Sequence, residues 1–121
     1  MDEHKIVSIA YGIAFDAHEG QFRRDGVTPY IDHPKAVFDR VRGDRKAEAV
    51  AWLHDVIEDS KENADSLRLR ELPEDVIEAV VALSHPKHEP YMEYLARVKQ
   101  NALAKKVKIA DMLSKDRKSV V

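Results

Sequence analysis

Residues 49–59 read AVAWLHDVIED, an apolar stretch that carries one histidine and three carboxylates. On a helical wheel at about 100° per residue, these four polar side chains fall along one arc, opposite the bulky apolar residues. The stretch predicts a helix over residues 44–59, with Asp44 as its N-cap. Two interpretations of the polar arc stay open: an exposed acidic stripe on an amphipathic helix, or a set of ligands for a cation.

The rest of the chain also has the pattern of helices. No window alternates apolar and polar residues over the length of a strand. We expect helices over residues 3–19, 73–83, 91–99 and 102–113, a helix that begins at Pro34 and is terminated by Gly43, and a short one within residues 60–72. The expected fold is therefore all-α, a compact bundle of about six to seven helices in which residues 1–121 form a single domain.

Composition excludes several classes of protein. The 121 residues include 20 Lys+Arg, 22 Asp+Glu and no Cys. Disulfide frameworks, thiolate zinc sites and cysteine nucleophiles are therefore ruled out. A net charge of −2 argues against general nucleic-acid binding. Charged residues near the N-terminus and the absence of a long apolar run predict a cytoplasmic protein with no membrane segment.

The C-terminal stretch from Arg97 to Lys118 is basic, in contrast to the rest of the chain. Such a stretch can attract ligands that bear phosphate groups, or it can be a solvated helix face. The sequence alone leaves both interpretations open.

Four residues are candidate metal ligands. His54 and Asp55 are adjacent, and together offer the nitrogen and oxygen donors that suit Mn, Fe, Zn or similar divalent ions. Two ligands rarely suffice, and His33, directly before Pro34, and Asp111, which prolongs an apolar helical stripe, are the other candidates. His33 could instead cap a helix, and Lys108 could instead be the ionic partner of Asp111.

Three motifs in order resemble one family. AHEGQFRRDGVTPYIDHP (residues 17–34), AWLHDVIEDS (51–60) and KIADM (108–112) are similar to the hydrolase domain of RelA/SpoT-type enzymes, within the HD superfamily of metal-dependent phosphohydrolases. The likeness extends over about residues 5 to 113 and is strongest to the small stand-alone alarmone hydrolases. It implies an HD-type helical bundle and Mn²⁺-dependent removal of the 3′-pyrophosphate of (p)ppGpp, the guanine nucleotide of the stringent response.

The resemblance also implies roles for individual residues. His33, His54, Asp55 and Asp111 would bind one Mn²⁺ ion, and Glu58 and Asp59 would position or deprotonate the attacking water. Substrate contacts are expected from five further residues: Arg23, Arg24, Tyr30, Lys108 and Lys115. His18, Gln21 and Thr28 would shape the loop of the first motif. His4, His85 and His88 match no ligand position and are expected on the surface.

The sequence departs from the family pattern at its C-terminal end. Lys115 stands where relatives carry Asn on the nucleoside side of the pocket, and the chain then ends sooner. The departure puts nucleotide selectivity in question, and uncovered apolar surface could favour a homo-oligomer. Two alternatives to ppGpp hydrolysis therefore stay open: a metal-dependent phosphohydrolase for another nucleotide or dinucleotide such as NADPH, and a nucleotide-binding regulatory module without turnover.

Overall fold

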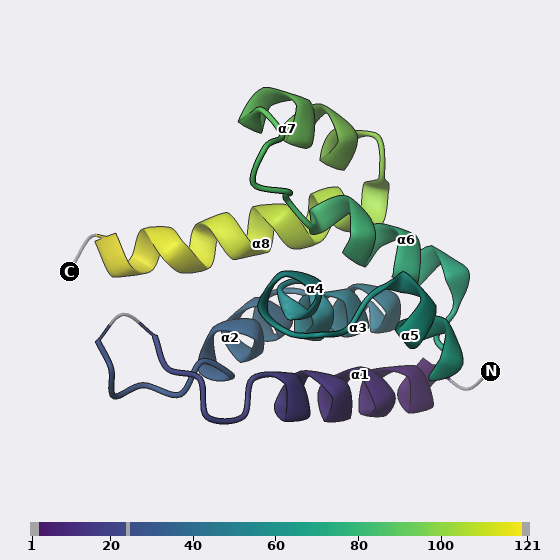
Figure 1. Cartoon of the computed structure of the whole chain (residues 1–121), viewed down its shortest axis with the longest axis horizontal. Coiled ribbons are helices and arrows are strands. Elements are labelled where there is room, and N and C mark those ends of the chain that lie inside the picture. The colour runs from purple at the N-terminus through teal and green to yellow at the C-terminus, as the bar shows by residue number, and fades with distance from the viewer. Residues whose placement is uncertain (1–2, 24, 120–121) are drawn as a thin grey trace.

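The computed structural model describes residues 3–23 and 25–119, and for residues 115–119 it describes the backbone alone. The expectation of an all-α fold is confirmed, since this part of the chain contains helices and no strand (Figure 1). An isolated antiparallel bridge between Phe22 and Pro29 closes the loop after the first helix. The helices described are α1 (Glu3–Ala17), α2 (Asp32–Arg40), α3 (Arg45–Leu53), α4 (Val56–Asp59), α5 (Ala64–Leu69), α6 (Glu74–Leu83), α7 (Tyr91–Lys99) and α8 (Ala102–Ser119).

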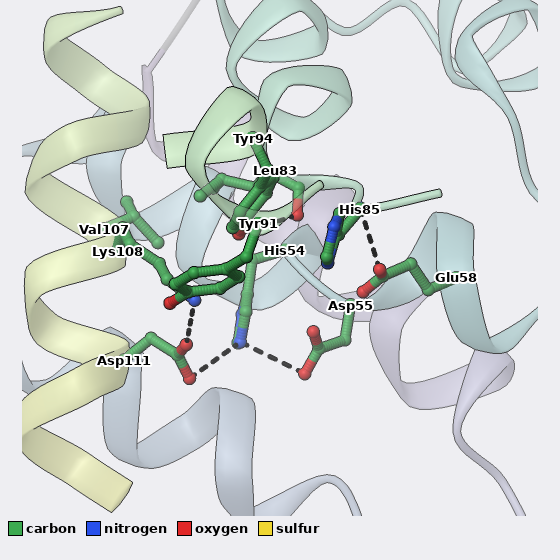
Figure 2. Close-up of a pocket in the computed structure, with 10 residues that line it drawn as sticks. All are labelled: His54, Asp55, Glu58, Leu83, His85, Tyr91, Tyr94, Val107, Lys108 and Asp111. Carbon is green, nitrogen blue, oxygen red and sulfur yellow. Dashed lines mark hydrogen bonds and ion pairs between the residues drawn. The ribbon is translucent and has the colours of Figure 1, made fainter. Parts of the chain in front are cut away.

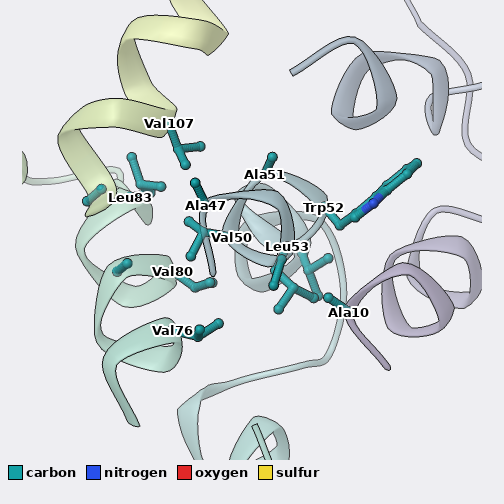
Figure 3. Close-up of a cluster of buried hydrophobic side chains, with 14 of the residues drawn as sticks. Ala10, Ala47, Val50, Ala51, Trp52, Leu53, Val76, Val80, Leu83 and Val107 are labelled. Atoms are coloured by element: carbon teal, nitrogen blue, oxygen red, sulfur yellow. The ribbon is translucent and has the colours of Figure 1, made fainter. Parts of the chain in front are cut away.

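Helix α3 is the centre of the bundle. It lies between α1 and α8 and contacts α1, α2, α6 and α8 (Figure 1). Every residue from Ala47 to Leu53 is buried, and Figure 3 shows Val50, Trp52 and Leu53 among the core side chains. A helix enclosed on all sides cannot carry an exposed acidic stripe. Its one acid, Glu48, is fully buried and accepts hydrogen bonds from the Gly43 N–H at 2.8 Å and from Arg45 Nη1 at 3.0 Å.

The single helix expected over residues 44–59 is divided in two. Asp44 is its N-cap, as expected, and accepts a hydrogen bond from the Ala47 N–H. The helix ends at Leu53, however, and Asp55, with φ −106° and ψ 0°, precedes the separate turn α4. This backbone conformation is common in active sites, and it changes the direction of the chain after Asp55. The expectation of one continuous helix is therefore wrong, although His54, Asp55 and Glu58 still line one cavity.

Helix α2 begins two residues earlier than the Pro34 start predicted from the sequence. Its first residue is Asp32, so that His33 lies within the first turn rather than on an extended entrance. Proline is tolerated in the first turn because N–H groups there have no partner within the helix. The consequence is a buried His33 that faces the bundle interior.

Helix α8 is longer than the segment expected over residues 102–113, because its backbone stays helical to Ser119. It packs against α2, α3, α6 and α7 and brings Asp111 to the end of α3. Within the part of the chain that is described, no helix has both the length and the apolar character needed to cross a membrane.

Candidate metal centre

Three side chains from three helices meet at the C-terminal end of α3. His33 Nε2 of α2 lies 2.8 Å from Asp111 Oδ1 of α8, and 3.3 Å from the Nε2 atom of His54. His54 Nε2 lies 3.6 Å from the same Asp111 oxygen. All three residues are buried, with at most 4% of their surface exposed. The described residues thus hold a cluster of two imidazoles and one carboxylate that is consistent with a divalent metal site.

The spacing of these atoms fits a coordination shell. A divalent ion with ligands about 2.1 Å away holds neighbouring ligand atoms about 3.0 Å apart in octahedral and about 3.4 Å apart in tetrahedral geometry. The three distances of the cluster, 2.8, 3.3 and 3.6 Å, bracket these values. Imidazole nitrogen with carboxylate oxygen is also a donor set that suits Mn, Fe or Zn.

The backbone of α3 fixes which nitrogen of His54 is available. His54 Nδ1 lies 2.7 Å from the carbonyl oxygen of Ala51. A carbonyl oxygen can only accept, so Nδ1 must carry the hydrogen that is donated. In the neutral ring the lone pair then belongs to Nε2, the atom that points into the cluster. A hydrogen bond of this kind is the usual way in which proteins orient a metal-binding histidine.

Asp55 adds a second carboxylate beside the cluster. Its Oδ2 atom lies 3.2 Å from His54 Nε2 and 3.7 Å from His33 Nε2. The Tyr30 hydroxyl donates a hydrogen bond of 2.7 Å to the same oxygen. The structure therefore brings together the four side chains that the sequence suggested as ligands. The Tyr30 hydroxyl orients one of them, Asp55, through a hydrogen bond.

Electrostatics lower the pKa of Asp55 and raise that of His54. Burial acts to lower the pKa of His54, but the Asp55 and Asp111 carboxylates outweigh it and raise that pKa to about 10. Burial acts to raise the pKa of Asp55, yet the His54 ring and the Tyr30 hydroxyl hold it well below its usual range. Without a metal ion, the His54 imidazole therefore carries a proton between the Asp55 and Asp111 carboxylates. A bound cation would take the place of this positive charge.

A cavity of about 250 Å³ opens beside the cluster. A cavity of this volume has room for several waters. Figure 2 shows Asp111, His54 and Asp55 along one edge of it, with Lys108 and Tyr91 above them. Its walls are His54, Asp55, Glu58, Leu83, His85, Tyr91, Tyr94, Val107, Lys108 and Asp111.

The acidic pair Glu58 and Asp59 lies on the short turn α4, which is held from two sides. Glu58 Oε1 accepts a hydrogen bond of 2.8 Å from the backbone N–H of His85, and the Asp59 carbonyl accepts one of 2.9 Å from Gln21 Nε2. Burial, followed by the charge of Asp55, raises the pKa of each carboxyl group above its usual value. Glu58 lines the cavity beside Asp55, where a carboxylate can take a proton from a bound water.

Known proteins resemble about half of this chain. The guanosine-3′,5′-bis(diphosphate) 3′-pyrophosphohydrolase of Haemophilus influenzae is 49% identical over 59 residues, which is 46% of this chain and 9% of that protein. The bifunctional (p)ppGpp synthase/hydrolase SpoT of Escherichia coli is 47% identical over 62 residues, 49% of this chain and 9% of the relative. A 3′-pyrophosphohydrolase of Vibrio cholerae is 48% identical over 63 residues, with 47% of this chain and again 9% of the relative covered. These matches support an HD-type RelA/SpoT hydrolase domain.

This likeness rests on individual proteins, since no family model matches the chain. The matched region spans less than a tenth of the length of these RelA/SpoT-type relatives, at 9% in each case. The similarity thus bears on one domain of proteins that are much longer.

The residues expected to contact substrate are dispersed. Lys108 lines the cavity, and its Nζ atom lies 3.4 Å from Asp111 Oδ2, so it is also the ionic partner considered from the sequence. Tyr30 contacts Asp55 and is not among the cavity walls. Arg23 is half-buried in the loop after α1, where its N–H bonds the Thr28 carbonyl, and it does not line the cavity either. Arg24 and the side chain of Lys115 lie outside the described residues.

Three cavity residues escaped the sequence analysis. His85 was expected on the surface, and this expectation is wrong: the residue is half-buried, lines the cavity and stacks on Tyr94 at 4.6 Å between ring centroids. Tyr91 and Tyr94 form the rest of this aromatic wall. Their spacing of three residues on one helix was a usable signal. Nothing in the sequence indicated that the loop before α7 folds back over α4.

Proposed function

We propose that this chain catalyses Mn²⁺-dependent hydrolysis of the 3′-pyrophosphate of (p)ppGpp, which yields GDP or GTP and pyrophosphate. The observation that carries the proposal is the convergence of His33, His54 and Asp111 from three helices at 2.8–3.6 Å. The names of the similar proteins, which are 3′-pyrophosphohydrolases of guanosine bis(diphosphate), supply the substrate.

We propose four residues as the ligands of the ion: His33, His54, Asp55 and Asp111. Their two imidazoles and two carboxylates would leave a bound Mn²⁺ close to neutral and open on the side of the cavity. The cation would lower the pKa of a water and polarise a phosphoryl oxygen.

The remaining chemistry is assigned to the chain's own side chains. Glu58 takes a proton from the attacking water while the oxygen of that water bonds to phosphorus. The bond from phosphorus to the ribose 3′ oxygen breaks, and this oxygen takes up a proton from solvent to become the 3′ hydroxyl. The raised pKa of Glu58 makes it a better acceptor than an ordinary carboxylate. Asp59 assists in placing that water, and Lys108, on the cavity wall, neutralises charge on the substrate's phosphates. Arg23, Arg24, Tyr30 and Lys115 stay predictions as substrate contacts.

The proposal is tested by incubating purified protein with ppGpp and Mn²⁺ and by measuring GDP and pyrophosphate. We expect Asp55→Ala to abolish turnover, whereas Asp65→Ala, an exposed acid on α5, should leave it unchanged. ppGpp, NADPH and deoxynucleotides are assayed side by side, so that preference for another compound identifies the alternative phosphohydrolase. Tight binding of ppGpp without any product would instead identify a regulatory module and refute the proposed activity.

The wider setting follows from the same proposal. We propose that residues 1–121 form one catalytic domain, cytoplasmic, whose partner is a guanine nucleotide, with no nucleic-acid or membrane partner. Self-association as a homo-oligomer is proposed from the exposed apolar face of α8, where Ile109, Met112 and Leu113 are each about half exposed.

A further inference from the structure

The loop of residues 84–90 between α6 and α7 is the support of Glu58. Its residue His85 donates the backbone N–H that Glu58 Oε1 accepts at 2.8 Å (Figure 2). Glu58 is otherwise carried only by the four-residue turn α4, which is too short to fix a long side chain by itself. The direction of the Glu58 carboxylate therefore depends on where this loop holds the His85 N–H.

The loop is held in turn by Arg97 of α7. Arg97 Nη2 donates hydrogen bonds to the Ser84 carbonyl at 2.7 Å and to the Ala82 carbonyl at 3.3 Å, at the point where α6 ends. Arg97 Nη1 forms an ion pair with Glu89 at the other end of the loop. One guanidinium group thus joins both ends of the loop that carries His85.

Aromatic packing completes this support. The Arg97 guanidinium lies 5.6 Å from the centre of the Tyr94 ring, on which the His85 ring stacks at 4.6 Å. The Tyr94 hydroxyl donates a hydrogen bond of 3.2 Å to the Leu83 carbonyl, and His85 Nε2 lies 2.7 Å from the Glu89 carbonyl. His85 is therefore held by contacts with Tyr94 and Glu89, and both of these residues also contact Arg97.

We propose that Arg97 is a positioning residue, which holds the residue 84–90 loop so that the His85 N–H directs the Glu58 carboxylate into the cavity beside Asp55. This inference rests on the proposed function only in giving Glu58 its task. Lysine cannot replace arginine here, because an ammonium group lacks the planar fork that bonds two carbonyls and a carboxylate together.

The first test is a double-mutant cycle on the Mn²⁺-loaded protein with ppGpp. We expect Arg97→Lys to lower kcat by about 10- to 100-fold, with KM changed by less than about threefold, because a misplaced base affects the transition state and not ground-state binding. In the Glu58→Gln background the same substitution should lower kcat by less than about twofold, since its effect passes through Glu58. Equal losses in both backgrounds would overturn the proposal.

The matched control is Arg68→Lys. Arg68 also bridges two acids, Asp65 and Glu74, but it lies on the exposed side of α5 away from the cavity. We expect it to leave kcat unchanged in both backgrounds. Should Arg97→Lys fail to fold, Glu89→Gln is the second variant, because it weakens the ion pair with Arg97 from the other side. It is expected to lower kcat by a smaller factor, and again to do so only when Glu58 is present.

A second readout needs neither metal nor substrate. Hydrogen exchange of the His85 amide, followed by NMR in the metal-free protein, should accelerate in both Arg97→Lys and Glu58→Gln and stay unchanged in Arg68→Lys. An unchanged His85 amide in Arg97→Lys would refute the positioning role. If the wild-type protein does not hydrolyse ppGpp, the proposed function fails, and this measurement still decides the role of Arg97.

Discussion

Replacing Tyr30 by Phe separates two possible roles of this residue. The substitution removes the hydroxyl that donates a 2.7 Å hydrogen bond to Asp55 Oδ2 and leaves the ring against His18. A hydrogen bond to a charged group contributes about 1.5–3 kcal/mol. The Asp55 side chain keeps 18% of its surface exposed, so water replaces part of this interaction and the lower bound applies. About 1.4 kcal/mol corresponds to a tenfold change in affinity, which is the loss of Mn²⁺ binding we expect.

The measurement is isothermal titration of metal-free protein with Mn²⁺, followed by steady-state kinetics at saturating metal. If Tyr30 acts by orienting Asp55, the Kd for Mn²⁺ rises about tenfold and KM for ppGpp changes little once the ion is bound. Tyr11→Phe is the matched control, because Tyr11 is an exposed tyrosine of α1 that packs edge-on against Trp52. It should alter neither constant.

The opposite pattern would refute this reasoning. A Kd for Mn²⁺ within twofold of the wild-type value, together with a KM for ppGpp raised tenfold or more, would make Tyr30 a substrate contact. The hydrogen bond to Asp55 would then have no role in orienting this carboxylate for the ion.

Three further predictions concern protonation and stability. Because the pKa of His54 is raised to about 10, Mn²⁺ binding at pH 7.5 should release one proton, and the affinity for Mn²⁺ should rise about tenfold per pH unit. Titration calorimetry in buffers of different ionisation enthalpy measures the number of protons released. A release of zero protons would contradict the prediction. Glu48→Gln should lower the free energy of unfolding in urea by about 1.5–3 kcal/mol, because the fully buried side chain loses its charge-assisted hydrogen bonds. A loss below about 0.5 kcal/mol, the scatter of surface substitutions, would contradict this role of Glu48. Gly43→Ala should cost about 1 kcal/mol in the same assay, because φ is +101° although the space is open, and an unchanged midpoint would be inconsistent with that conformation.

Much of the architecture could be predicted from the sequence, because helical periodicity and caps are local properties. The starts of α6 and α7 follow from Pro73 and Pro90, each of which is the N-cap of its helix. The Asp44 cap of α3 is equally local. The apolar run of residues 49–53 also predicted a helix. Because this helix is buried on every side, neighbouring helices leave room only for small side chains at several of its positions.

What the sequence could not reveal depends on tertiary packing. The break at His54 and Asp55 has no proline or glycine to signal it, and a wheel drawn through both residues misses the change in chain direction after Asp55. The approach of His33 to Asp111 joins residues 78 positions apart, which residue patterns alone could suggest only through family likeness. The loop with His85 folds back onto Glu58, and Arg97 contacts this loop partly through the backbone carbonyls of Ala82 and Ser84, which no sequence pattern displays.

The alanines of α3 have a consequence for how the protein tolerates change. Ala47, Ala49 and Ala51 have no exposed surface, and Figure 3 shows Ala47 and Ala51 among the side chains of the core. Even one extra methylene at such a place forces neighbours apart, at a cost of about 1–3 kcal/mol. His54 directly follows this helix, and His33 and Asp111 lie on α2 and α8, which contact it. A change in the spacing of these helices would therefore change the distances within the cluster of His33, His54 and Asp111. A requirement for fixed distances between the candidate metal ligands would therefore also favour small side chains at these buried positions of α3.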